Sequence, residues 1–126
     1  MSDLSHVGES GRARMVDVSG KEATARTATA RGTLTCRPDT LDQVRAGSTP
    51  KGSVIATSEL AGVMAAKRTA ELVPLCHPLP LTHVEVRIGI DDSLPGFRIE
   101  AEVRTKAETG VEMEALTAVA VAGLTL

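Results

Sequence analysis

Apolar and polar residues alternate along three stretches of the chain. Residues 21–36 contain ATARTATARGTLTC, and residues 81–90 and 97–105 read LTHVEVRIGI and FRIEAEVRT. A period of two is typical of strands with one buried face. The last two stretches are separated by DDSLPG, which has the composition of a turn and predicts a hairpin.

Between these stretches the apolar positions recur at helical spacing. PDTLDQVRA at residues 38–46 begins with Pro-Asp and is followed by Gly47, which predicts a short helix. Residues 54–73 are rich in Ala, Leu and Met, and Pro74 ends this second helix. Its apolar face is expected to consist of Leu60, Val63, Met64 and Leu72.

The final stretch, VEMEALTAVAVAGLTL, is apolar on nearly all sides after its first turn. Such a helix is expected to be buried, in part against a second subunit. The order strand, helix, helix, hairpin, helix predicts an α+β fold, with helices packed on one face of an antiparallel sheet. A split β-α-β arrangement is the expected topology. Residues 1–14 are polar and without periodicity, so we expect a mobile tail followed by a single domain over residues 15–126.

The amino-acid composition argues against several classes of function. A chain of 126 residues with 42% hydrophobic and 24% charged residues is typical of one soluble domain. The net charge is -2 and Phe97 is the only aromatic residue, which argues against nucleic acid and anionic membranes as partners. The longest apolar run, residues 115–126, is too short to span a bilayer, and the first residues do not resemble a signal peptide. Two cysteines fit no disulfide framework, so we expect a cytoplasmic protein with reduced thiols.

The stretch LVPLCHPLPL encloses Cys76 and His77 between prolines and aliphatic residues. Pro74 and Pro78 hold the pair rigidly on a connection between helix and strand, where functional side chains concentrate. The alternative is a buried cysteine beside a capped histidine. A metal site is disfavoured, because the sequence shows no set of three or four ligands at suitable spacing.

Three cations are candidates for binding a polyphosphate. Lys51 lies in a turn-rich loop, and Lys67 and Arg68 interrupt the apolar helix before Pro74. Phosphate groups require several convergent positive charges. The alternative is that these are ordinary solvated side chains.

The start of the last helix carries two glutamates. Thr109 and Glu112 have the spacing of a capping box, which would account for Glu112 structurally. Glu114 lies about 200° further around the helix, so the two carboxylates cannot share a face. Glu114 at the amino end of a buried helix therefore needs a salt bridge or a substrate hydrogen bond.

Three motifs together resemble the molybdenum cofactor biosynthesis protein C (MoaC) family. They are MVDVSGKEAT at residues 15–24, AAKRTAELVPLCHPLPL at residues 65–81 and KAETGVEMEALTAVAVAGLT at residues 106–125. The resemblance covers nearly the whole chain. It implies a ferredoxin-like fold, assembled as a hexamer of three dimers with sites between subunits. It also implies a cyclic pyranopterin monophosphate synthase of molybdenum cofactor biosynthesis. Such an enzyme converts 3',8-cyclo-7,8-dihydroguanosine 5'-triphosphate, a small-molecule substrate, into cyclic pyranopterin monophosphate and pyrophosphate, without a cofactor.

The resemblance also implies roles for particular residues. His77, Lys51 and Lys67 match catalytic positions of the family. The expected substrate-binding residues are Leu75, Cys76, His77, Met113 and Glu114, with Glu112 and Arg26 as further candidates.

The resemblance departs from the family pattern at the end of the chain. The last helix reaches Leu126 without a stop signal, whereas in the family it continues into a segment that carries an essential aspartate. We therefore expect an incomplete chain, with the catalytic aspartate beyond Leu126, that binds substrate weakly and does not turn it over. The alternatives are a non-catalytic substrate-binding relative and a structural oligomer.

Overall fold

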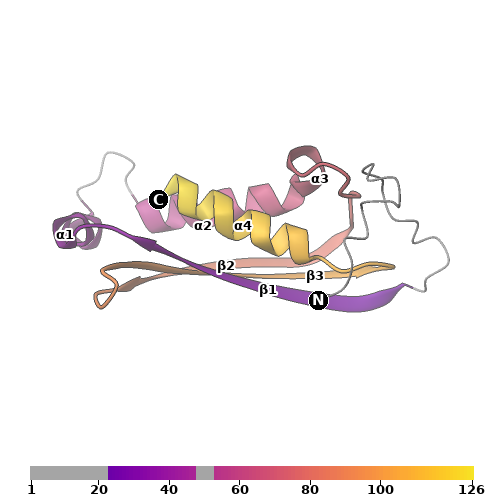
Figure 1. The fold of residues 1–126 in the computed structure, drawn as a ribbon, viewed down its shortest axis with the longest axis horizontal. Coiled ribbons are helices and arrows are strands. Elements are labelled where there is room, and N and C mark those ends of the chain that lie inside the picture. Colours follow the sequence, from indigo (N-terminus) through magenta and orange to yellow (C-terminus); the bar gives the residue numbers. More distant parts are fainter. Residues whose placement is uncertain (1–22, 48–52) are drawn as a thin grey trace, which may run out of the picture.

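The computed structural model describes residues 23–47 and 53–126. Strand β1 (Thr24–Thr35) is followed by helices α1 (Pro38–Ala46), α2 (Val54–Lys67) and α3 (Thr69–Leu72). Strands β2 (Leu81–Asp91) and β3 (Gly96–Ala107) then precede helix α4 (Glu112–Thr125). The strands form one antiparallel sheet in the order β1-β3-β2, and α2 and α4 lie side by side on one of its faces (Figure 1). The predicted α+β fold of the ferredoxin-like type is confirmed. The expected domain boundary at residue 15 and the tail over residues 1–14 lie outside the described residues.

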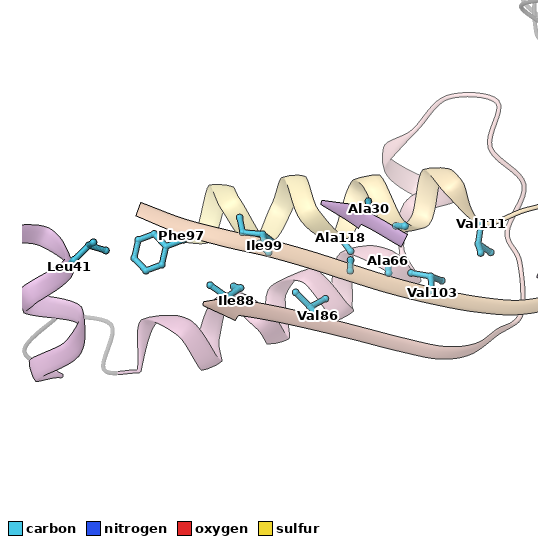
Figure 2. Close-up of a cluster of buried hydrophobic side chains, with 13 residues drawn as sticks. Ala30, Leu41, Ala66, Val86, Ile88, Phe97, Ile99, Val103, Val111 and Ala118 are labelled. Carbon is cyan, nitrogen blue, oxygen red and sulfur yellow. The ribbon is translucent and has the colours of Figure 1, made fainter. Parts of the chain in front are cut away.

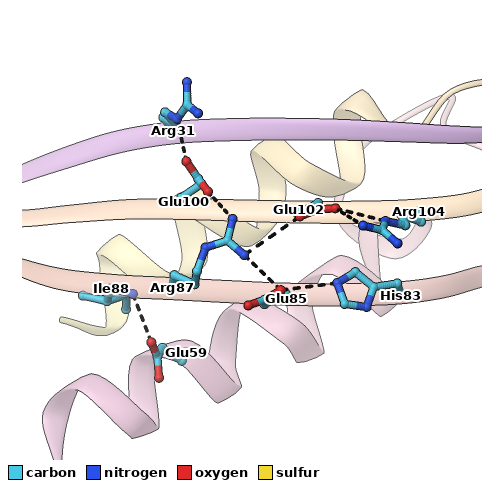
Figure 3. A network of polar contacts seen from close by, with 9 residues as sticks. All are labelled: Arg31, Glu59, His83, Glu85, Arg87, Ile88, Glu100, Glu102 and Arg104. Carbon is cyan, nitrogen blue, oxygen red and sulfur yellow. Dashed lines mark hydrogen bonds and ion pairs between the residues drawn. The ribbon is translucent and has the colours of Figure 1, made fainter.

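The alternation in the sequence divides the sheet into two faces. On β3, the central strand, Phe97, Ile99, Ala101 and Val103 are buried and form the core with the helices (Figure 2). The residues between them are charged and lie on the open face, where Arg87 pairs with Glu85, Glu100 and Glu102 (Figure 3). The period of two therefore predicted which side of each strand is buried.

The hairpin and the first helix lie where the sequence predicted them. The β2–β3 hairpin turns over residues 92–95, and Gly96 opens β3. A Cβ on Gly96 would lie 2.0 Å from the Leu34 carbonyl oxygen, so only glycine fits between these backbones. Helix α1 begins at Pro38 and is closed by Gly47 at φ 69°, the left-handed conformation that glycine adopts freely.

The prediction for the second helix is wrong in two respects. The helix is not continuous over residues 54–73, because it is interrupted at Arg68, between α2 and α3. The Thr69 hydroxyl donates to the carbonyl oxygens of Ala65 and Ala66, at 3.2 Å and 2.9 Å. The Ala65 carbonyl also accepts from the Arg68 amide, a tighter turn than the α-helical one. These contacts replace the bond that would continue the helix.

The face of α2 that meets the core is also not the predicted one. Leu60, Met64 and Leu72 are 60%, 47% and 57% exposed, and of the four predicted residues only Val63 packs against the core. The buried face consists of Val54, Ser58, Gly62, Ala65 and Ala66. At Gly62 an added Cβ would lie 3.0 Å from the Ala118 carbonyl oxygen of α4. Small residues face the core because the two helices approach too closely for leucine or methionine.

Helix α4 begins later than the predicted capping box requires. Its N-cap is Val111, which makes no side-chain cap, and Glu112 is the first helical residue. Thr109 is therefore not a cap. The buried residues of α4 are Glu114, Ala115, Ala118 and Ala122, whereas Leu116 and Leu124 are 54% and 85% exposed. In the single chain only one face of this helix is buried. Within the described ranges, no helix combines the length and apolar character that crossing a bilayer requires.

Candidate functional site

A cavity of about 340 Å³ lies between the connection that follows α3 and the amino end of α4. It brings together two segments that are more than thirty residues apart in the sequence. Its lining residues are Val73, Pro74, Leu75, Cys76, His77, Leu79, Thr109, Gly110, Glu112, Met113 and Glu114. All the candidate residues at positions 75–77 and 112–114 are therefore at one place.

The backbone of the connection is held in an unusual conformation. Leu75 has φ 63°, and it is the only non-glycine residue with positive φ in the described part of the chain. This left-handed conformation costs an L-residue roughly 1–2 kcal/mol. Outliers of this kind cluster at functional sites, where the surrounding structure imposes them. Here the turn at Leu75, between Pro74 and Pro78, places Cys76 and His77 on the cavity wall.

Glu114 is the most deeply placed charged group of the site. Its side chain is only 3% exposed, although it lies on the first turn of α4. The Cys76 Sγ lies 3.7 Å from Glu114 Oε2, within reach of a thiol hydrogen bond. Burial raises the pKa of the Glu114 carboxyl and the nearby Glu112 charge adds to the rise, whereas hydrogen bonds from the Glu114 backbone amide and the Cys76 thiol oppose it. A carboxylate with few partners in a cavity is suited to accept hydrogen bonds from a ligand.

The other titratable groups of the cavity differ in their exposure. Glu112 is exposed and His77 is half-buried. Burial raises the pKa of the Cys76 thiol, and the Glu114 charge and hydrogen bond add to this effect. The cavity thus combines a protonated thiol, an imidazole and two carboxylates in different environments. Such a set can bind a polar heterocycle and move protons on it.

The structure does not bring the predicted cations into the cavity. Lys51 lies outside the described residues. Lys67 is exposed at the carboxyl end of α2, and it does not line the cavity. Arg26 lies on β1, where its Nε donates to the Ala107 carbonyl oxygen at 3.3 Å. Within the described residues, no lysine or arginine therefore lines this cavity.

Sequence reasoning missed two features. Thr109 and Gly110 line the cavity, and only their place next to Glu112 in the sequence could have indicated this. On the open sheet face, ligand atoms of His83, Glu85 and Glu102 lie within 4.8 Å of one another. Their carboxylates already pair with Arg87 and Arg104, which would compete with a cation (Figure 3). The absence of a metal therefore stays a prediction.

The fold and the cavity define a ferredoxin-like α+β protein with a small, mainly apolar cavity that holds a few titratable groups at the amino end of its last helix. Residues 15–126 match the model of the MoaC family. A protein of Roseiflexus sp. (strain RS-1) is 60% identical over 126 residues, which are all of this chain and 80% of the relative. Relatives from Nostoc sp. and Thermomicrobium roseum are each 58% identical, and the chain covers 74% and 76% of their lengths. All three are named cyclic pyranopterin monophosphate synthase. The chain belongs to the MoaC family.

Proposed function

We propose that this protein is a cyclic pyranopterin monophosphate synthase of molybdenum cofactor biosynthesis. Its substrate would be 3',8-cyclo-7,8-dihydroguanosine 5'-triphosphate, and its products cyclic pyranopterin monophosphate and pyrophosphate. Relatives of that name cover the whole chain. The observation that carries the proposal is the cavity, which joins residues 75–77 to Met113 and Glu114.

The cavity residues suit the chemistry of the base. Opening the purine ring and closing a pyranopterin requires proton donors and acceptors around a heterocycle. Glu114 is buried, and its carboxylate can accept hydrogen bonds from the amino and imino groups of the base. Histidine is the side chain most often used for proton transfer, and His77 is the candidate proton shuttle. Leu75, Met113 and the aliphatic wall exclude water from a reactive intermediate.

The phosphates require groups from outside the cavity. Formation of a cyclic monophosphate breaks the bond between the α-phosphorus and the pyrophosphate oxygen, which makes the reaction a phosphorus–oxygen lyase step. We assign Lys51 and Lys67 to charge neutralisation of the triphosphate and of the leaving pyrophosphate, with Arg26 as a further phosphate contact. Glu112 is a further candidate for a contact to the base or sugar. Since Lys67 and Arg26 do not line the cavity of their own chain, a neighbouring subunit would supply such groups. No step is assigned to a cofactor.

The test is conversion of the cyclised triphosphate by the full-length gene product. We expect equimolar pyrophosphate and cyclic pyranopterin monophosphate, measured by an enzyme-coupled pyrophosphate assay and by mass spectrometry. Thermal stabilisation by the substrate without conversion would instead support a non-catalytic binding relative. Neither stabilisation nor conversion would contradict both.

We further propose a homo-oligomer, a hexamer built from three dimers. Support comes from large apolar side chains that a single chain leaves exposed on α2, α3 and α4. They are Leu60, Met64, Leu72, Met113, Leu116 and Leu124. Patches of this kind mark interfaces between proteins. Sedimentation equilibrium at micromolar concentration should give a mass six times that of the chain, and a stable monomer would count against it.

Both cysteines of the chain are free, which agrees with our placing the protein in the cytoplasm.

A further inference from the structure

The contact between Cys76 and Glu114 joins the two halves of the cavity. Its partners are 38 residues apart in the sequence, and Sγ lies 3.7 Å from Oε2. The thiol has a second acceptor in reach, the His77 carbonyl oxygen at 3.9 Å. The carboxylate is closer and carries a charge, and hydrogen bonds to charged acceptors are the stronger ones. The Glu114 carboxylate is therefore the favoured acceptor for the thiol.

From this geometry we propose that Cys76 is a positioning residue, whose thiol donates to Glu114 Oε2 and holds the carboxylate in its substrate-accepting orientation. This role deepens the proposed function and rests on it, because the ligand that Glu114 accepts is the base of the cyclised triphosphate.

A thiol suits this task better than a stronger donor would. An ionised carboxylate has about four acceptor sites, and a thiol is a weak donor. Cys76 therefore fixes the rotamer of Glu114 without competing with the amino groups of the substrate. The left-handed backbone of Leu75, at φ 63°, contributes to the same contact, because it turns Cys76 toward α4.

The charges that face the pair determine what a substitution should do. The other titratable groups lining the cavity are His77 and Glu112. The thiol hydrogen bond favours the ionised carboxylate and lowers the pKa of Glu114 against the effect of burial. Conversely, the Glu114 charge raises the pKa of the Cys76 thiol. Replacing either side chain should therefore change the pKa of the other.

The first experiment measures the alkylation of Cys76 by iodoacetamide between pH 7 and 9. For this experiment Cys36→Ser is introduced into the full-length gene product, so that of the two free cysteines Cys76 alone remains. Glu114→Gln should raise the rate severalfold at pH 8, because the thiolate no longer faces a carboxylate. Glu112→Gln is the matched control, since Glu112 is exposed in the same cavity. Equal effects of the two variants, or none, would overturn the contact.

The second experiment measures kcat/KM against pH for the cyclised triphosphate. In Cys76→Ala the Glu114 carboxyl keeps the hydrogen bond from its own backbone amide but loses the one from the thiol, so the acid limb of the profile should move to higher pH. Cys76→Ser keeps a donor on a shorter side chain, so it should restore only part of that position. A purely structural cysteine would change the height of the profile and leave its limb in place, which would overturn the role. If the wild-type protein does not convert the substrate, the proposed function fails, and the alkylation rates still decide the contact.

Discussion

His77→Ala is expected to lower the rate of pyrophosphate release by a factor of about 10² to 10⁴, the usual contribution of one positioned proton-transfer group. His77 lines the cavity on a connection rather than in the core, and it is half-buried. Its removal should therefore change the free energy of unfolding by no more than about 1 kcal/mol. The measurements are single-turnover pyrophosphate release and urea denaturation of the full-length gene product.

His83→Ala is the matched control for this substitution. His83 lies on β2 and points to the open sheet face, where its Nε2 is 3.5 Å from Glu85 (Figure 3). It lies outside the cavity lining and should leave turnover nearly unchanged. If both alanine variants lost activity equally, or if His77→Ala unfolded the chain with its specific activity intact, the assignment of His77 would be wrong.

Glu114→Gln should reduce activity and raise stability at the same time. The amide keeps the shape of the side chain but loses a charge-assisted hydrogen bond to the substrate, which contributes about 1.5–3 kcal/mol. That corresponds to a loss in kcat/KM of roughly 10- to 100-fold. Because the wild-type carboxylate is buried with a raised pKa, its ionisation opposes folding. The glutamine variant avoids this effect and should show a higher midpoint of thermal unfolding at pH 7.5.

The gain in stability should depend on pH in a defined direction. Between the ordinary glutamate pKa of about 4.3 and the raised pKa of Glu114, the folded state binds more protons than the unfolded state. The wild-type protein therefore loses stability as the pH rises through this window, and the variant does not. The difference should be full above the raised pKa of Glu114 and vanish below about pH 4. Glu112→Gln should show a much smaller gain, because this side chain is exposed and its charge only adds to the raised pKa of Glu114. If Glu114→Gln were less stable than the wild type at pH 7.5, the carboxylate would stabilise the folded state, and this prediction would be wrong.

The sequence predicted those parts of the fold that depend on local chemistry. Alternation gave the three strands, DDSLPG gave the hairpin turn, and Pro38 with Gly47 gave the limits of α1. The buried face of α2 could not be predicted in this way. Hydrophobicity favours Leu60 and Met64, but the spacing between α2 and α4 at Gly62 admits only small side chains. That spacing is a property of two packed elements, which no single stretch of sequence contains.

The site was predictable to a similar extent. Prolines around Cys76 and His77 indicated a rigid turn, and the spacing of Glu112 and Glu114 indicated two different environments. The structure puts Glu112 at the surface and Glu114 in the interior. The thiol contact to Glu114 was not foreseen, because it depends on the left-handed backbone at Leu75. The capping box at Thr109 was wrong because a spacing of three residues cannot show where a helix begins.

The strand order has a consequence for the way this chain is made. Among the strands that the structure describes, β1 hydrogen-bonds only to β3, and its pairs run from Thr24 with Ala107 to Thr35 with Gly96. Each pair closes a loop of about 60 to 80 residues, so β1 gains contacts only after a large loss of chain entropy. The β2–β3 hairpin closes over a short turn and can form early. During synthesis β1 is therefore made well before β3, and it can join the sheet only after the β2–β3 hairpin has been made.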